Sequence, residues 1–354
     1  MNFSELLSHL LQKGASEVHF HAGMPVLARI GGQLQSVGGR KLKPTSTAAL
    51  VQQLCSPQQK ARLEVYRQVD LAYSLPGVSR LRANVFYQRG SASVVFQVIG
   101  PQEASLQQVN LPEKYLHHFR DLDRGLLLVV GPRGAGKSTT LARLVDEINT
   151  TQAKLILTIE DPIEYLHKSK RSAVVQREIG SDAVSFEAAL MGAQRQRPDV
   201  IAIGEIRDVS TASAALNAAQ NGHLVLSTLV APDSARAIHT LLKLFPPEER
   251  MAQRIVLAES LVGLIAQRLI PSTAGERVAV MEVVLMGPAL REVLKHPESN
   301  GRFQELLHDP SLADCQSFDA HLLELYRSGQ VDYQTALLNT TDPAHFEAEA
   351  SHPL

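Results

Sequence analysis

The stretch GPRGAGKST constrains this chain most, because it matches the pattern G-x-x-x-x-G-K-[ST] of a phosphate-binding loop. The glycines let backbone N–H groups close around a phosphate, the lysine reaches the outer phosphates and the serine hydroxyl binds Mg²⁺. An apolar run precedes the loop and a helical pattern follows it, so the positive end of a helix faces the anion. We expect ATP and Mg²⁺ to bind here, with Ser138 as a magnesium ligand, at Gly131, Pro132, Arg133, Gly134, Ala135, Gly136, Lys137, Ser138 and Thr139.

Composition narrows the class of protein. The chain has 354 residues and a formal net charge of −1, which disfavours a basic nucleic-acid-binding protein. Its two cysteines, Cys55 and Cys315, are far apart and lack metal-ligand spacing, which fits a reducing cytosol. The N-terminus has neither the basic leader nor the apolar core of a signal peptide, and no apolar run approaches the ~20 residues of a membrane span. We expect a cytoplasmic protein without a transmembrane segment.

Two regions differ in their patterning. Residues 1–105 read as a small α+β domain, and the polar, proline-containing stretch around residues 106–118 reads as a linker. In residues 119–354, short β-branched runs alternate with helical segments, which predicts a parallel sheet covered on both faces. From about Pro246 we expect mainly helix, including all of PEERMAQRIVLAESLVGLIAQRLI, interrupted by one strand, RVAVMEVVLM.

Acidic residues follow two of the predicted strands. In VIAIGEIRD, Gly204 stands where a generic phosphate-loop ATPase carries an Asp, and Glu205 follows. Glu205 can orient or deprotonate an attacking water, or be an ordinary charge at a helix N-terminus. In TIEDPIEY, Glu160, Asp161 and Glu164 can face the Mg²⁺ and the γ-phosphate, since ligands lie at the carboxyl ends of parallel strands. Asp161-Pro162 is also plain turn chemistry.

These blocks, in this order, resemble the type IV pilus retraction ATPases (PilT and PilU) within the secretion ATPase superfamily. The resemblance covers nearly the whole chain, through GASEVHFHAG, RLRANVFYQ, DRGLLLVVGPRG, ILTIEDPIEY, RPDVIAIGEIRD and NGHLVLSTL. GPALREVLKH is similar to the C-terminal signature of retraction motors, loosely kept here as Ala289, Leu290, Arg291, Val293 and Leu294. The end of the chain looks somewhat closer to PilU.

The resemblance implies a PAS-like N-terminal domain followed by a RecA-like ATPase domain with a helical C-terminal part, assembled as a hexamer. It implies nucleotide bound between domains and completed by basic residues of the N-terminal domain, and partners that include a membrane platform protein and a paralogous retraction ATPase. The resemblance strengthens Glu205 and Glu164 as catalytic candidates. Arg82 matches the first arginine of the family pattern and His223 a histidine of its motif, which makes both further catalytic candidates.

The chain departs from the family pattern at positions that bear on turnover. Val230 stands where the family has a histidine after GHLVLSTL, and valine can neither donate a hydrogen bond nor carry charge. Gln97 stands where the family presents a second arginine, and Arg89 nearby is either a substitute or an exposed turn residue. Gln196 and Arg197 replace an acidic pair and make that edge basic. Nucleotide binding should survive these changes better than turnover.

Three hypotheses follow. The first is a hexameric retraction ATPase that is a weak or accessory motor, with transition-state contacts depleted and binding contacts intact. The second is a nucleotide-gated structural subunit that hydrolyses little. The third is a nucleic-acid-directed ATPase using the cluster HKSKR at residues 167–171, which more often is a solvated loop. His19 and His21 share a strand face and can hold a metal, although structural histidines are favoured.

Overall fold

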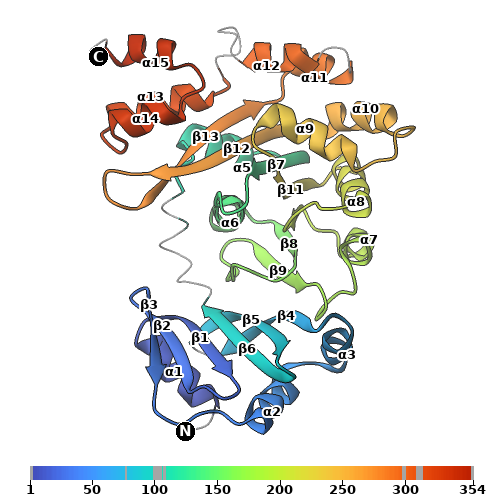
Figure 1. The fold of residues 1–354 in the computed structure, drawn as a ribbon. Helices are drawn as coiled ribbons and strands as arrows, with labels where there is room; N and C mark the ends of the chain where they lie inside the picture. Colours follow the sequence, from blue (N-terminus) through green and yellow to red (C-terminus); the bar gives the residue numbers. More distant parts are fainter. Residues whose placement is uncertain are drawn as a thin grey trace. The chain divides into compact units, whose positions relative to one another are not determined.

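The computed structural model describes residues 3–75, 78–98, 106, 109–296, 300–307 and 314–351. The chain forms two compact units (Figure 1). The smaller unit comprises Met1–Gln102 with Asp161–Leu166, and the larger unit comprises Glu103–Glu160 and His167–Leu354. The predicted domain limits stay a prediction, since residues 99–105, 107 and 108 of the junction lie outside the described residues. Residues 113–118 of the predicted linker lie in a helix, α5.

The smaller unit is an antiparallel sheet of six strands in the order β3-β2-β1-β6-β5-β4. Alternate side chains, such as Val18, Phe20 and Val94, point into its core, and the other face is polar. Gly31 and Gly32 form a hairpin turn between two paired strands, and both have positive φ, which glycine adopts without strain. The elements of this unit are α1 Phe3–Gln12, β1 Ala15–His21, β2 Val26–Ile30, β3 Gln33–Val37, α2 Pro44–Leu54, α3 Pro57–Tyr66, β4 Gln68–Leu75, β5 Ser79–Gln88 and β6 Ser91–Val98.

The larger unit is built on a seven-stranded sheet in the order β13-β12-β7-β11-β10-β8-β9. Its strands pair in parallel except for the antiparallel pair β12–β13. Its elements are α5 Glu113–Arg120, β7 Gly125–Gly131, α6 Lys137–Thr151, β8 Leu155–Glu160, β9 Ala173–Glu178, α7 Phe186–Gln196, β10 Val200–Ile203, α8 Val209–Gln220, β11 Leu224–Val230, α9 Ser234–Lys243, α10 Arg250–Ser260, β12 Leu261–Pro271, β13 Arg277–Leu285, α11 Pro288–Lys295, α12 Asn300–Leu307, α13 Phe318–Arg327, α14 Tyr333–Asn339 and α15 Pro343–Ala350.

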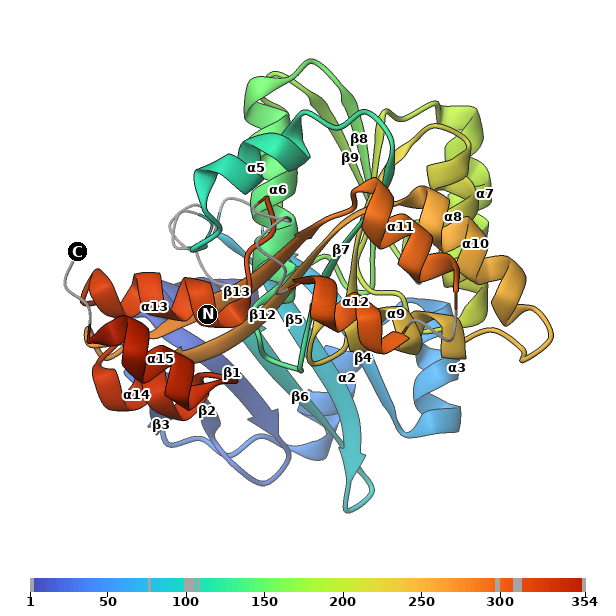
Figure 2. The ribbon, with the colours of Figure 1, turned by 90° about the horizontal axis from the view of Figure 1, so that it is seen from above.

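Both faces of this sheet are buried, as the continuous apolar runs predict. Along β7, Leu126 and Leu128 belong to one hydrophobic cluster, whereas Leu127 and Val129 belong to another. Figure 2 shows α5 and α6 on one side of the sheet and α7, α8 and α10 on the other. The α/β class and the helical C-terminal part are therefore as predicted.

One segment of the larger unit corrects the sequence analysis. The predicted helix through LVGLIAQRLI is wrong: α10 ends at Ser260 and the chain continues as strand β12. A short, mainly apolar run does not by its periodicity distinguish a buried strand from a buried helix. Gly263 is the signal that could have decided it, because glycine weakens a helix interior and here a Cβ would meet the Phe119 ring at 2.5 Å. This strand brings a residue to the functional site.

The edge strand β13 is covered by the C-terminal region. The Met281 N–H donates to His321 Nδ1 at 2.9 Å, and the Met281 carbonyl accepts from Gln316 Nε2 at 3.1 Å. Val283 and Gln316 exchange both backbone hydrogen bonds at 2.8 Å. These contacts satisfy backbone groups that an open sheet edge leaves unpaired. Within the described residues, no helix is long and apolar enough to cross a membrane.

Candidate functional site

The predicted phosphate loop forms a cradle between β7 and α6. Gly134 and Gly136 have φ of 76° and 85°, a region that glycine adopts without strain. The tip of the loop, Pro132 to Gly134, is exposed, and the fifteen-residue helix α6 begins directly after it. A loop with positive-φ glycines at a helix N-terminus presents N–H groups to an anion. The geometry fits a phosphate.

Lys137 lies folded over this loop. Its ammonium group donates to the carbonyl oxygens of Gly131 at 3.1 Å and Pro132 at 3.0 Å, and the side chain is buried. The lysine cation is therefore already held at the cradle. Ser138 and Thr139 are partly exposed in the first turn of α6. A cation, a hydroxyl and a helix N-terminus at one place fit a nucleotide phosphate with Mg²⁺.

Two of the predicted carboxylates lie at the same edge of the sheet as the loop. Ile159 and Ile203 are paired in register, so Glu160 and Gly204-Glu205 follow them at the carboxyl ends of parallel strands. The Gly204 N–H donates to the Ile159 carbonyl at 2.9 Å. The structure thus brings Glu160 and Glu205 to the edge where the loop begins.

Each of these two carboxylates has a partner. Glu160 Oε1 accepts from Thr158 Oγ1 at 2.8 Å and from Gln176 Nε2 at 3.2 Å. Glu205 Oε2 lies 3.3 Å from Arg207 Nη2. A carboxylate has about four lone-pair sites, so the Arg207 contact still leaves Glu205 able to accept a proton from water.

Val230 lies beside the first glycine of the loop. Strands β11 and β7 are parallel and in register from Leu224↔Gly125 to Val230↔Gly131. The position that is a histidine in the family pattern is therefore a direct neighbour of the phosphate loop, and its side chain is about one-third exposed (36%). Valine leaves this place without a hydrogen-bond donor or a charge.

His223 does not lie with these residues. It precedes β11 at the opposite edge of the sheet, where its carbonyl accepts from the Gly125 N–H at 3.0 Å. Gly125 and Gly131 are the two ends of β7, about 20 Å apart at ~3.3 Å per residue. His223 is therefore a strand's length away from the phosphate loop of its own chain, and its catalytic role stays a prediction.

The edge of the sheet opposite the phosphate loop carries a cluster of charged side chains. A polar cavity of about 530 Å³ is lined there by Lys154, Arg197, Asp199 and His223, among others. Arg197 has φ of 51°, a left-handed conformation that Asp and Asn adopt more easily than Arg. The replacement of the acidic pair thus places a cation at the edge away from the phosphate loop.

In the smaller unit, Arg82 and Gln97 are cross-strand neighbours on the polar face. They are paired in the β5–β6 ladder, and Gln97 is also paired with Glu17 of β1. Arg82 is half-exposed, with Nη2 3.7 Å from Asp70 Oδ2. Arg89 lies in the turn after β5, seven residues or about 23 Å from Arg82, which is beyond the reach of a side chain. Arg89 therefore does not reach the part of this face where Gln97 lies.

Three further predicted residues belong to the smaller unit. Asp161 is exposed and Glu164 is partly buried, and both lie in the segment Asp161–Leu166. Their catalytic or magnesium-binding roles stay predictions. His19 Nε2 lies 3.1 Å from Glu17 Oε2, and among the described residues no group of three metal-ligating side chains is found.

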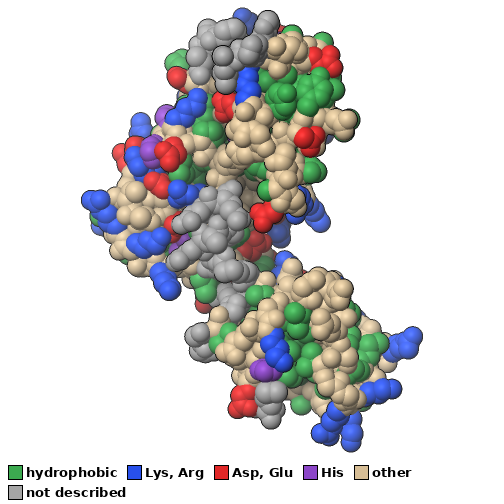
Figure 3. Space-filling view, turned by 90° about the vertical axis from the view of Figure 1, so that its left-hand side faces the viewer, with side chains coloured by type: hydrophobic (Ala, Val, Ile, Leu, Met, Phe, Trp, Pro, Cys, Tyr) green, Lys and Arg blue, Asp and Glu red, His purple; other side chains and the backbone are tan. Residues whose placement is uncertain are grey.

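The basic cluster HKSKR is part of a connection that packs on α6. Lys170 Nζ lies 2.8 Å from Asp146 Oδ1, and Asn149 Nδ2 donates to the Lys168 carbonyl at 2.8 Å. Burial lowers the pKa of His167 to about 4, so this histidine is neutral near pH 7. On the face drawn in Figure 3, basic and acidic side chains of the larger unit are interspersed. These contacts favour a structural role for the cluster.

Comparison with known proteins places the chain in a family. The type II/IV secretion system protein family matches residues 2–282. The chain is 36% identical to the type IV pilus retraction ATPase PilT of Pseudomonas aeruginosa, over 98% of this chain and 100% of that protein. The protein is a member of the type II/IV secretion system family. It is also 34% identical to the type IV pilus ATPase PilU of P. aeruginosa, over 95% of this chain and 88% of that protein.

Solved structures of this family have the same fold. The crystal structure of the pilus retraction motor PilT with bound ADP superposes with a TM-score of 0.86 at 37% identity, over 98% of this chain and 99% of that one. The ATPase DotB of Legionella pneumophila superposes with a TM-score of 0.84 at 27% identity, over 94% and 93% of the two chains. The predicted fold class is confirmed.

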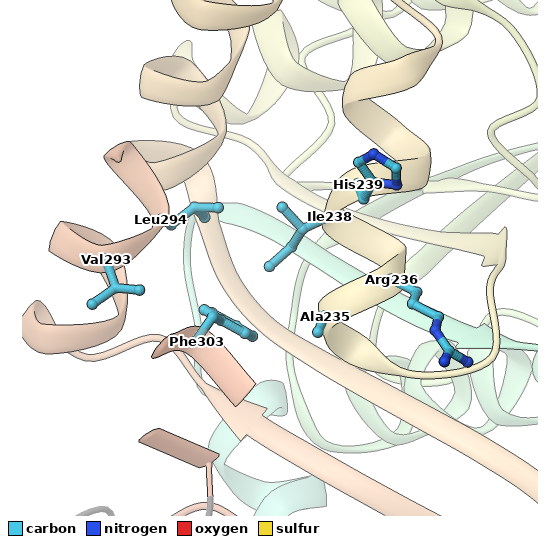
Figure 4. Close-up of a pocket in the computed structure, with 7 residues that line it drawn as sticks. All are labelled: Ala235, Arg236, Ile238, His239, Val293, Leu294 and Phe303. Atoms are coloured by element: carbon cyan, nitrogen blue, oxygen red, sulfur yellow. The ribbon is translucent and has the colours of Figure 1, made fainter. Parts of the chain in front are cut away.

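The C-terminal signature of this secretion-system family member divides into three structural roles. Leu290 and Leu294 are buried in the core. Arg291 Nη1 donates to the carbonyls of Ala258 at 2.7 Å and Glu259 at 2.9 Å, which caps the end of α10. Val293 lines an apolar pocket of about 280 Å³ between α9, α11 and α12. In Figure 4, Ile238, Leu294 and Phe303 face this space, while Arg236 and His239 extend from the other side of α9.

The sequence analysis missed one residue that contacts the phosphate loop. Gln267 of β12 is fully buried, and its side-chain Nε2 donates to the Ala135 carbonyl within the loop. It was hidden because β12 was expected to be helical, which sets no sheet register. A polar residue inside an otherwise apolar run is the signal that could have singled it out.

Proposed function

We propose that this chain is an ATPase of type IV pilus retraction, which couples ATP hydrolysis to mechanical work in twitching motility. The observation that carries the proposal is the complete phosphate loop, with Lys137 held in it, in a chain that matches PilT from end to end. The matches to PilU and to a twitching motility protein of Neisseria gonorrhoeae support the same class.

The residues have distinct roles in this proposal. The loop N–H groups hold the phosphates of ATP, and Lys137 exchanges its two carbonyl contacts for phosphate oxygens. Ser138 holds Mg²⁺, with Glu160 and Asp161 as further candidates on the metal side. Glu205 orients and deprotonates the attacking water. When bound, Mg²⁺ neutralises charge on the phosphoryl group. Arg82 and Glu164, which belong to the smaller unit, are further catalytic candidates in our proposal.

The altered positions suggest a motor of low turnover. Val230 beside Gly131 offers no donor, and Gln97 beside Arg82 offers no charge. An arginine that neutralises transition-state charge is worth roughly 10³–10⁵ in rate in well-studied GTPases. Losing such groups lowers turnover, whereas the intact loop keeps ground-state binding. We therefore propose a weak or accessory motor that works beside a stronger paralogue.

The assembly is proposed from the relatives. We infer a homo-hexamer at the cytoplasmic face of a bacterial inner membrane, acting on a membrane platform protein of the pilus. A paralogous retraction ATPase is a second proposed partner, since this chain matches PilT and PilU at similar identity.

The test is steady-state phosphate release by the purified protein at saturating Mg-ATP, compared with Glu205→Gln. Glutamine keeps the shape of the side chain and removes its basicity, and a general base contributes on the order of 10²–10⁴ in rate. We expect turnover at least roughly tenfold above the variant, with equal binding of a fluorescent ADP analogue. Equal rates in the two proteins would contradict a motor.

A second function is favoured by the same substitutions. A nucleotide-binding structural subunit of a pilus or secretion machine needs the loop and Lys137, but it does not need the histidine and arginine that Val230 and Gln97 replace. Nucleotide binding with turnover no higher than that of Glu205→Gln supports this alternative. Absence of nucleotide binding contradicts both functions.

A further inference from the structure

Strand β12 places Gln267 against the phosphate loop. Ala266 is paired with Val130 in the parallel β7–β12 ladder, so Gln267 is next to Gly131. A Cβ on Gly131 would lie 2.6 Å from the Gln267 carbonyl oxygen, and a Cβ on Gly136 would lie 3.1 Å from Gln267 Nε2. Gln267 thus occupies the space between the two glycines that frame the loop, and side chains at either position would displace it.

The hydrogen bond from Gln267 sets the direction of one peptide in the loop. Nε2 donates to the carbonyl of Ala135, which belongs to the same peptide as the Gly136 N–H. In a trans peptide the C=O and the N–H point in opposite directions. With the carbonyl held toward Gln267, the Gly136 N–H is directed away from it. Because Gly136 rotates about φ at little cost, this peptide needs a restraint from outside the loop.

The oxygen of the Gln267 amide, Oε1, contributes no hydrogen bond to the fold. Oε1 is buried and has no hydrogen-bond partner among the described residues. An unsatisfied buried acceptor costs about 1–3 kcal/mol. Turning the amide over would set Oε1 against the Ala135 carbonyl, with two acceptors facing each other. An apolar side chain of the same length would therefore give about the same folding stability. What it would not provide is the hydrogen-bond donor to the Ala135 carbonyl.

We infer that Gln267 is a positioning residue of the phosphate loop, which holds the Ala135 carbonyl and thereby presents the Gly136 N–H to a bound phosphate. The inference rests on the proposed nucleotide-binding function. A donor presented in this way contacts phosphate before and during hydrolysis, so it acts on binding more than on the rate of the bound complex. Val230 borders the other side of Gly131, so the loop lies between Gln267, which restrains it, and a valine, whose side chain offers no polar group.

The test compares Gln267→Met with Gln316→Met. Methionine matches glutamine in length and lacks the donor. Gln316 is a matched control, because it is also a buried amide that donates to a backbone carbonyl of this unit, that of Met281 at 3.1 Å, and it does not contact the loop. The measurements are the affinity for a fluorescent ADP analogue, the KM and kcat for Mg-ATP, and the thermal unfolding midpoint without nucleotide.

We expect Gln267→Met to weaken ADP binding roughly tenfold, the effect of one hydrogen bond to a charged group, and to raise KM more than it lowers kcat. Its unfolding midpoint should stay close to that of the unaltered protein, whereas Gln316→Met should change stability but not affinity. Unchanged affinity in Gln267→Met would overturn the inference, even if the protein proves to be an ATPase. Failure of the unaltered protein to bind ADP would instead contradict the proposed function.

If Gln267→Met does not fold, Gln267→Asn takes its place. Asparagine keeps the amide but is one carbon shorter, so it cannot span the distance to the Ala135 carbonyl. We expect the same loss of ADP affinity in this variant. Affinity equal to that of the unaltered protein would overturn the inference.

Discussion

The phosphate loop of the larger unit and the Arg82–Gln97 face of the smaller unit differ in how firmly they are held. The loop follows a fully buried strand, and Lys137 and Gln267 hold its carbonyls from within. Arg82 and Gln97 lie on the outer face of an antiparallel sheet, where Arg82 is half-exposed. The chain keeps the phosphate-binding lysine and serine of the loop, whereas Gln97 on the sheet face stands where the family pattern has an arginine.

This difference indicates which residues of this fold affect nucleotide binding and which affect the rate of hydrolysis. Buried side chains are constrained by packing as well as by chemistry, so fewer substitutions are tolerated around the loop. An exposed cross-strand position is constrained by chemistry alone, and its substitution leaves the core intact. A chain can therefore lose turnover on the exposed face while it keeps nucleotide binding in the loop.

The strongest test of this comparison sets Lys137→Ala against Arg82→Ala. Removing the ammonium that contacts the loop carbonyls and the phosphates should weaken ATP binding by roughly 100-fold. Arg82→Ala should leave binding within about threefold and lower turnover at least roughly tenfold. Equilibrium binding and phosphate release measured on the same preparations check both. If Arg82→Ala weakens ATP binding as much as Lys137→Ala does, the idea that the sheet face affects the rate but not the binding of nucleotide is wrong.

A second experiment restores the altered positions with Gln97→Arg and Val230→His. We expect turnover to rise at least roughly tenfold at nearly unchanged affinity, because the new groups act on transition-state charge. Gln97 is also paired with Glu17, so a new arginine can be captured by that carboxylate. Adding Glu17→Gln should increase the gain, and Gln97→Met is the uncharged control. No gain in any of these proteins would show that neither position limits the rate.

The last test of the comparison is a difference in pH dependence between the units. Burial lowers the pKa of His321 in the larger unit to about 4 from an ordinary 6.5. This histidine is neutral when folded, so its contribution to stability is present above pH 6.5 and is lost as the pH falls toward 4, by about 3 kcal/mol in total. In the smaller unit, the hydrogen bond from Arg29 lowers the pKa of Glu17, so that contribution is lost only as the pH falls below about 4.5.

His321→Asn tests the larger of these two effects. The asparagine oxygen can accept the Met281 N–H as His321 Nδ1 does, without a titrating ring. Urea unfolding between pH 7 and pH 4.5 should show a flatter loss of stability in the variant than in the unaltered protein. Parallel pH profiles would mean that His321 is not what destabilises the fold in mild acid.

The sequence predicted the elements whose signals are local. The strands before the loop and before Gly204, and the α/β class, were all predicted from short patterns. Strand β12 was missed, because an apolar run buried on both faces has no period that separates strand from helix. Helix α5 formed within the predicted linker, because Tyr115 and Phe119 pack into the core.

The sequence by itself determined that this chain carries a phosphate loop, because that chemistry resides in nine consecutive residues and in their backbone. Only the tertiary structure decided which distant residues adjoin the loop. Gln267 donates to a loop residue 132 positions earlier, and Val230 borders Gly131 while His223, seven residues before Val230, lies at the far edge. The physical reason is that sheet order and strand register decide at which edge of the sheet each residue lies. Neither of these can be predicted from how far apart two residues are along the chain.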